Sequence, residues 1–157
     1  MSAEYHAIER MGEPAALTAV LTKEPLGELS LPAAHESVPR ARAFVRNLIG
    51  ARGIADVRDD AEILVSELVT NAIRHASTSG APLRLVILRA GERLRIEVHD
   101  PSPAAPSARR IDLLEETGRG WFLVAAIADR HGTDLTYSGK AVWCELTAWP
   151  PTVAWTA

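Results

Sequence analysis

Three polar side chains recur at intervals of four residues in the otherwise apolar segment SELVTNAIRHA, residues 66–76: Glu67, Asn71 and His75. On a helix this spacing sets successive side chains about 40° apart, so the three form one stripe. The stripe predicts Asn71 and His75 at the edge of the helix's apolar face rather than opposite it. Polar groups at the margin of a core need partners, because a buried amide without one costs about 1–3 kcal/mol. Either neighbouring backbone or a ligand supplies those partners, and for Glu67 the alternative is simple solvation.

Two further features could contact a ligand. Asp100 ends the segment RLRIEVHD, and Pro101 stops a strand ladder from continuing. An acid at that place could accept a hydrogen bond from an exocyclic amine, or it could simply open a turn. Gly118-Arg119-Gly120 leads directly into an apolar helical segment, where glycines allow close backbone approach and free N–H groups favour phosphate oxygens. Arg119 could contact phosphate or remain a solvated loop arginine.

The hydrophobic periodicity predicts the elements that must hold these residues. The predicted order is a strand at 28–31, helices at 37–52 and 58–76, a hairpin of strands 83–91 and 93–100, a mobile loop from 101, a helix at 118–132, and a second hairpin at 133–149 that turns at Ser138-Gly139. Ser37 is the expected N-cap of the first helix, which stops at Gly53. This order predicts an α/β (α+β) two-layer sandwich, with about three helices on one face of a mostly antiparallel mixed sheet.

Residues 1–27 show no clean period and are interrupted by proline and glycine. They are expected to form a flexible leader, with a short helical piece near residues 15–21. The domain then spans residues 28–149, and residues 150–157 form a C-terminal tail.

The composition limits the class of protein. With 157 residues, 47% of them hydrophobic and 24% charged, the chain is expected to form one globular domain. A net charge of −3 gives no overall attraction to nucleic acid or membranes. The lone Cys144 excludes an internal disulfide and disfavours a cysteine-based zinc site. Without a signal peptide or a long apolar run, a cytoplasmic protein is expected.

Other polar and aromatic residues carry no clear site signal. The arginines of the first helix are scattered around it, which disfavours a DNA-binding regulator; these are Arg40, Arg42, Arg46 and Arg52. Four histidines lack metal-ligand spacing: His6, His35, His99 and His131. Four aromatic residues are expected to pack in the core or against the loop after Asp100: Trp121, Phe122, Trp143 and Trp149.

Taken in order, E-x-x-x-N on a helix, Asp at the end of a hairpin strand, and G-x-G before a helix resemble the motifs of the Bergerat-fold (GHKL) ATPases. This superfamily includes gyrase, heat-shock chaperones, histidine kinases and MutL. Within it, SELVTNAIRHA and GRGWFLVAAIADRHG are similar to the anti-sigma-factor serine/threonine kinases abundant in actinobacteria. The resemblance covers about residues 28–148.

The resemblance implies ATP and Mg²⁺ as ligands and assigns roles to individual residues. Asn71 matches the family's metal ligand, a role that suits an oxygen donor on a rigid helix. Glu67 matches the residue that orients or deprotonates the attacking hydroxyl, and Asp100 matches the acid that binds the adenine amino group. Phosphate contacts are implied for Arg74, His75, Gly118 and Gly120, while Arg119 is a candidate on its charge alone. The polar stripe would then line a nucleotide cleft.

Three features depart from the family's pattern. The usual D-x-G-x-G is replaced by DPSPAAP, in which Pro101 and Pro103 remove two N–H donors. Ala141 stands where the family commonly has a threonine near adenine. The segment between Pro101 and Thr117 is short, which suits a small regulatory kinase better than a gyrase-like ATPase.

The leading functional hypothesis is an anti-sigma factor with serine/threonine protein kinase activity. By resemblance its partners are a sigma factor and an anti-sigma-factor antagonist protein, with no direct nucleic acid or membrane contact and a possible homodimer. The alternative is a non-catalytic, nucleotide-gated module that regulates transcription or signalling through a partner, which the altered DPSPAAP segment and Ala141 favour.

Overall fold

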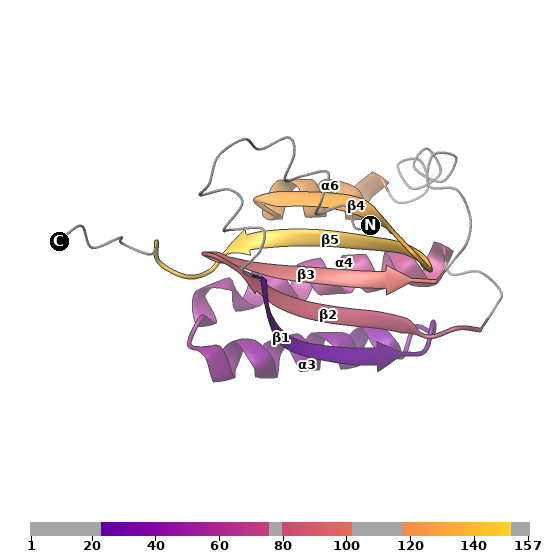
Figure 1. Cartoon of the computed structure of the whole chain (residues 1–157), viewed down its shortest axis with the longest axis horizontal. Coiled ribbons are helices and arrows are strands. Elements are labelled where there is room, and N and C mark those ends of the chain that lie inside the picture. Colours follow the sequence, from indigo (N-terminus) through magenta and orange to yellow (C-terminus); the bar gives the residue numbers. More distant parts are fainter. Residues whose placement is uncertain (1–22, 76–79, 102–117, 152–157) are drawn as a thin grey trace.

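The computed structural model describes residues 23–75, 80–101 and 118–151. The elements are β1 (Lys23–Leu31), α3 (Ser37–Arg52), a short 3₁₀ turn (Ala55–Val57), α4 (Arg58–His75), β2 (Leu83–Ala90), β3 (Arg93–Asp100), α6 (Gly118–Ile127), β4 (Arg130–Thr136) and β5 (Gly139–Thr147). The five strands form one sheet in the order β1-β2-β3-β5-β4 (Figure 1). Every pairing is antiparallel, so the sheet is not mixed.

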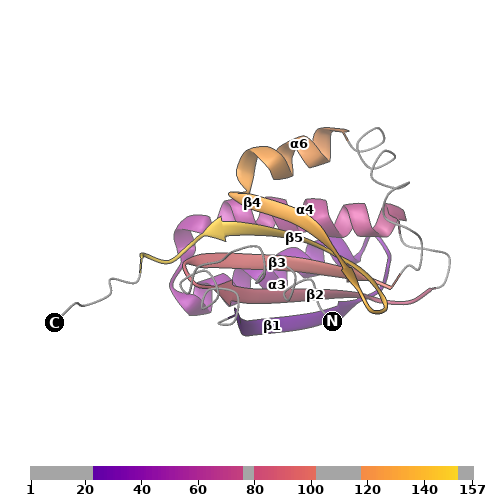
Figure 2. The same cartoon turned by 45° about the horizontal axis from the view of Figure 1, so that its top comes forward.

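The helices cover one face of this sheet. Figure 1 shows α3 behind β1 and β2 and α4 behind β3 and β5, while Figure 2 shows α6 beside α4 and above β4. The predicted two-layer α/β sandwich is therefore confirmed. None of the helices in the described ranges is long and apolar enough to cross a membrane.

The core lies between the helices and the sheet. On α3, Ala41, Val45 and Ile49 recur every four residues and are fully buried, which explains the helical pattern of the sequence. Burying each large aliphatic side chain contributes about 1.5–3 kcal/mol. Ser37 is the first residue of α3 and not its cap, because its hydroxyl donates a hydrogen bond of 2.6 Å to the Pro32 carbonyl.

Strand β1 begins earlier than the sequence predicts. It starts at Lys23 and pairs with β2 along its length, so residues 23–27 belong to the sheet rather than to a leader. Pro25 is tolerated because β1 is an edge strand and its register shifts between Pro25 and Gly27. The expected leader helix near residues 15–21 and the mobile loop after Pro101 lie outside the described residues.

The boundary between α6 and β4 also differs from the prediction. The helix ends at Ile127 rather than Gly132, because the Asp129 N–H already donates to the Glu145 carbonyl of β5 at 2.9 Å. Gly132 lies within β4, where a Cβ atom would come 2.7 Å from the Trp143 ring. This glycine therefore permits close packing between strands and is not a helix stop. The final hairpin turns at residues 137–138, one residue earlier than expected.

The face of the sheet opposite α3 and α4 carries a buried charged cluster centred on Arg95, which is 5% exposed. We call Arg95, Glu97, Asp134 and Glu145 the Arg95 cluster. The Arg95 guanidinium lies 2.6 Å from Glu97, 3.3 Å from Asp134 and 3.6 Å from Glu145, measured between nitrogen and carboxylate oxygen. It also stacks 4.0 Å from the Trp143 ring centroid. One buried cation thus holds three carboxylates.

The environment of Glu97 in the Arg95 cluster shifts its pKa. Burial alone would raise the pKa of Glu97, but hydrogen bonds from His99 and Arg95 outweigh it and lower the pKa to about 2. The His99 bond joins Nε2 to Glu97 Oε1 at 2.9 Å. Glu97 is therefore ionised in the folded protein across the ordinary pH range.

Candidate functional site

The elements that carry the candidate residues converge at one end of the sandwich. Figure 1 shows the carboxyl ends of α4 and β3 at the right, and α6 begins on the same side of the molecule, above them. Candidate residues from three separate parts of the sequence are thereby brought to one region. Nothing in the spacing along the chain alone could show this convergence.

Helix α4 presents the predicted polar stripe at the edge of its apolar face. Leu64 and Leu68 are at most 1% exposed and anchor the helix on the sheet. Asn71 is 9% exposed, Glu67 is half-buried and Arg74 is exposed. The edge position predicted for Asn71 is therefore correct, while Arg74 points into solvent on the helix exterior.

Asn71 fits a metal ligand. Its Oδ1 atom is buried and accepts no hydrogen bond from any residue that the structure describes. An unsatisfied buried amide oxygen costs about 1–3 kcal/mol, so its retention suits a ligand that supplies the missing contact. An amide oxygen is also among the donors that Mg²⁺ accepts, with phosphates and waters completing its octahedron.

Glu67 lies one helical turn before Asn71 and is half-buried. Within the described ranges, its carboxylate has no hydrogen bond and no ion pair, unlike Glu62, which is bound by Arg46. A partly buried carboxylate that no described residue binds can accept a proton from a hydroxyl beside it.

Asp100 ends β3 and is 3% exposed. Strand alternation places it with Val98 on the face that the helices cover. Lys140 lies directly opposite Asp100 in the β3–β5 ladder and is 5% exposed. Directly opposed residues have Cβ atoms about 4.5–5.5 Å apart, so an ammonium group accompanies the acid on this face.

The sequence motifs do not single out Lys140, because a strand pattern alone does not show that it pairs with Asp100. The structure pairs Ala141 with His99, on the face opposite Asp100 and the helices. The loss of a threonine hydroxyl at Ala141 therefore does not affect the Asp100 side of the sheet. The pairing of β4 with β5 is set by the two-residue turn between Thr136 and Gly139. The register between β3 and β5 then decides which residue lies opposite Asp100.

For the predicted phosphate contacts at the start of α6, the structure describes the backbone but not the side chains. Residues 118–120 form the first turn of α6, where backbone N–H groups lack partners within the helix. The side-chain positions of these residues, including that of Arg119, lie outside the described part of the structure. His75 is half-buried at the end of α4.

The four aromatic residues named in the sequence analysis have different environments. Trp121 is half-buried and packs edge-on against His131, with ring centroids 5.4 Å apart. Phe122 is 77% exposed and does not pack in the core. The other predicted environment, the loop after Asp100, lies outside the described residues. Trp149 stacks on Arg89, 4.4 Å from guanidinium carbon to ring centroid, and Trp143 stacks on Arg95.

The thiol of Cys144 takes no part in this region. It is fully buried, and burial raises its pKa to about 12. A thiol in that environment is not a nucleophile, because the reactive species is the thiolate.

Gly139 maintains the position of the Asp100 strand end. A Cβ atom at Gly139 would lie 2.0 Å from the Asp100 carbonyl oxygen and 2.9 Å from the Pro101 Cα. Gly139→Ala is therefore expected to displace Asp100 and to lower both the thermal stability and the affinity for the nucleotide that the resemblance implies, measured by thermal unfolding and calorimetry. Gly50→Ala is the matched control, since a Cβ there meets nothing within 4 Å. It is expected to leave nucleotide affinity unchanged, and equal losses in both variants would contradict the role of Gly139.

An antiparallel sheet covered on one face by helices, with Asn71, Asp100 and a glycine-led helix at one end, is the arrangement of the GHKL ATP-binding sandwich. Comparison with known proteins agrees: residues 31–145 match the family model described as the histidine kinase-like ATPase domain. The chain belongs to this family.

Individual relatives support the same grouping. The chain is 30% identical over 118 residues to the serine-protein kinase RsbW of Staphylococcus epidermidis, covering 65% of this chain and 74% of that protein. It is 33% identical over 90 residues to the uncharacterized protein SCO4941 of Streptomyces coelicolor, covering 55% of this chain and 85% of that protein. The resemblance to GHKL anti-sigma-factor kinases is thereby confirmed.

Proposed function

We propose that this protein binds ATP with Mg²⁺ and acts as an anti-sigma factor with serine/threonine protein kinase activity. Its phosphoryl acceptor would be a serine or threonine of an anti-sigma-factor antagonist. The observation that carries the proposal is the buried Asn71 Oδ1 atom, which lacks a hydrogen bond from the described residues and lies one turn from Glu67. The similarity to a serine-protein kinase supports the type of reaction.

Asn71, Asp100, Lys140 and the first turn of α6 would bind the nucleotide and its metal ion. Asn71 Oδ1 is the atom that would hold Mg²⁺, which when bound would neutralise charge on the triphosphate. Asp100 would accept a hydrogen bond from the exocyclic amine of adenine. Lys140 would donate to an acceptor on the same edge of the base. The first turn of α6 would donate backbone N–H groups to phosphate oxygens.

In the transfer step, Glu67 would accept the proton of the attacking hydroxyl. The hydroxyl oxygen forms a bond to the γ-phosphorus, and the bond from that phosphorus to the oxygen bridging to ADP breaks. Little covalent chemistry is required of the protein, since positioning and charge stabilisation provide most of the catalysis in phosphoryl transfer.

Glu67→Gln tests this step directly. The variant is expected to bind ATP with Mg²⁺ within about twofold of the wild type, because the amide keeps the size of the side chain. Phosphoryl transfer is expected to fall at least about 100-fold, because general-base catalysis contributes about 10²–10⁴-fold. Transfer is measured with γ-labelled ATP and a cognate antagonist protein. Glu62→Gln, on the same helix but paired with Arg46, should transfer normally.

The alternative function is a nucleotide-gated binding module without catalysis. Pro101 favours it, because a proline directly after Asp100 removes an N–H donor at the entrance to the cleft. If the wild-type protein binds ATP with Mg²⁺ but transfers no phosphoryl group to a cognate antagonist, and Glu67→Gln leaves the regulatory output unchanged, the kinase proposal is wrong and this alternative holds. The sigma factor, the antagonist and a homodimer remain predictions from the resemblance.

A further inference from the structure

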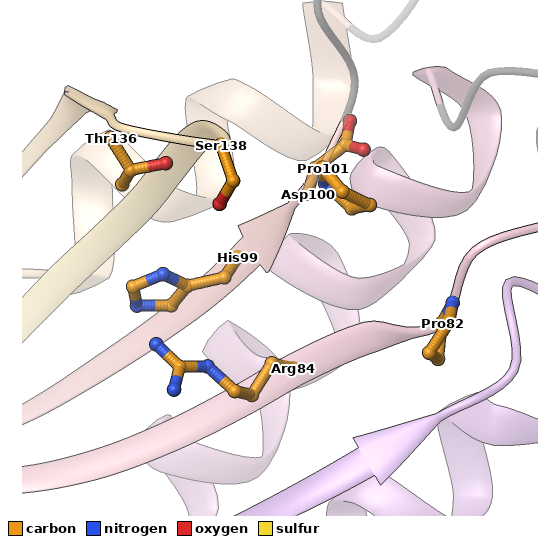
Figure 3. Close-up of a pocket in the computed structure, with 7 residues that line it drawn as sticks. All are labelled: Pro82, Arg84, His99, Asp100, Pro101, Thr136 and Ser138. Carbon is orange, nitrogen blue, oxygen red and sulfur yellow. The ribbon is translucent and has the colours of Figure 1, made fainter.

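A hollow of about 270 Å³ lies at the end of the sheet where Asp100 is found. Most of its polar side chains belong to the face of the sheet that the helices do not cover. Its lining residues are Pro82, Arg84, His99, Asp100, Pro101, Thr136 and Ser138. Arg84 and His99 are direct partners across β2 and β3, and Thr136 and Ser138 come from the end of β4 and the following turn. Figure 3 shows the Arg84 and His99 side chains lying together below Ser138.

The side chains that face this hollow are hydrogen-bond donors. Arg84 carries five N–H groups, and its ion pair with Glu28 at 3.2 Å is half-exposed on both sides, so water competes with it. His99 bonds Glu97 through Nε2, which leaves Nδ1 outside that bond. The hydroxyls of Thr136 and Ser138 add two more donors.

No carboxylate side chain among the lining residues faces the hollow. Asp100, the single acid in the lining, alternates with His99 along β3 and belongs to the helix-covered face, where it is 3% exposed. Pro82 and Pro101 restrict the backbone on two sides of the hollow. The result is a solvent-accessible cavity with a guanidinium fork, an imidazole and two hydroxyls.

We propose that this hollow binds a phosphoryl dianion, either free phosphate or a phosphorylated serine or threonine side chain. A tetrahedral phosphoryl group offers three free oxygens to the guanidinium fork and the hydroxyls, whereas a planar carboxylate offers only two. The hollow is distinct from the proposed nucleotide cleft, because Arg84 and His99 lie on one face of the sheet and Asp100 and Lys140 lie on the other.

The test is a titration followed by amide chemical shifts in ¹⁵N-labelled full-length protein. The probes are inorganic phosphate, a phosphoserine peptide and the same peptide unphosphorylated. Saturable shifts are expected at residues 84, 99 and 136–139 with both phosphorylated probes, and none with the unphosphorylated peptide. Tighter binding of the phosphopeptide identifies a modified side chain as the ligand, and tighter or equal binding of phosphate identifies the free ion.

Three variants separate specific binding from general charge effects. Arg84→Gln is expected to weaken phosphate binding at least tenfold. Arg40→Gln makes the same change of charge on the exposed surface of α3 and should have no effect. Glu28→Gln removes the carboxylate that competes with phosphate for Arg84, so this variant should bind phosphate at least as tightly as the wild type.

Two results would overturn the proposal. One is equal weakening by Arg84→Gln and Arg40→Gln, which would indicate screening of the net charge alone. The other is shifts confined to α4 and α6, which would place phosphate in the nucleotide cleft. Because Asn71→Leu should leave binding at the hollow intact, the outcome does not depend on the proposed ATP-binding function.

Discussion

Asn71→Leu is expected to abolish magnesium-dependent ATP binding while leaving the free energy of unfolding unchanged or higher. Leucine has a similar size, and the buried Oδ1 atom that it removes accepts no hydrogen bond from the described residues. Removing an unsatisfied buried polar atom can stabilise a protein by about 1 kcal/mol, whereas losing the proposed metal ligand removes the magnesium contribution to affinity. Urea unfolding without nucleotide and calorimetry with ATP, with and without Mg²⁺, measure the two effects.

Asn47→Leu provides the matched control, because Asn47 is an exposed asparagine on α3. It should bind ATP as the wild type does. The assignment of Asn71 is contradicted if Asn71→Leu retains magnesium-dependent binding. It is also contradicted if that variant loses more than about 2 kcal/mol of stability, since Asn71 would then serve the fold rather than a ligand.

The largest effect on stability is expected from Arg95→Ala. Truncating Arg95 leaves Glu97 and Glu145 buried without their main cation, and removing one partner of a buried ion pair costs about 3–5 kcal/mol. Chemical unfolding at neutral pH measures the loss. Arg130→Ala is the control, because Arg130 also contacts Glu145, at 3.7 Å, but its side chain is 53% exposed. It should cost less than about 1 kcal/mol, and equal losses in the two variants would contradict the account.

The Arg95 cluster also predicts an acid-dependent loss of stability. Because the pKa of Glu97 is lowered to about 2 in the folded protein, ionised Glu97 stabilises the fold above its ordinary pKa of 4.5. That contribution, about 3 kcal/mol, is lost as the pH falls from 4.5 towards 2. In Arg95→Ala the loss over this pH range should be smaller, and an unchanged pH dependence would show that Arg95 does not hold the Glu97 pKa down.

The sequence predicted the parts of the site that depend on local periodicity. The four-residue spacing of Glu67 and Asn71 placed both on α4, and the burial of Asn71 at the edge of the apolar face agrees with the helical wheel. Asp100 was likewise recognisable as the last residue of a strand before proline. These features follow from the geometry of a single element.

Features that depend on contacts between elements were not predictable in the same way. The sequence predicted that the helix ends at Gly132. In the structure Gly132 lies in β4 and packs against the Trp143 ring of the neighbouring strand. The sequence did not show that Lys140, and not Ala141, faces the same side as Asp100. A shift of one residue in strand pairing reverses the face of every side chain, so this depends on the register.

Arg95 and Glu97 illustrate the same limit on the other face of the sheet. They alternate with apolar residues in RLRIEVHD, a pattern typical of a strand with one solvated face, yet both are buried. Asp134 and Glu145, which lie near the Arg95 guanidinium, are distant in the sequence, so the ion cluster becomes visible only when the strands are placed side by side.

The central claim is that the end of the sandwich at Asn71, Glu67 and Asp100 binds ATP with Mg²⁺. Calorimetric titration of the wild-type protein with ATP, in the presence and absence of Mg²⁺, tests it most directly. One ATP per chain is predicted, with affinity at least tenfold higher when Mg²⁺ is present. Absence of saturable ATP binding in the presence of Mg²⁺ would contradict the claim.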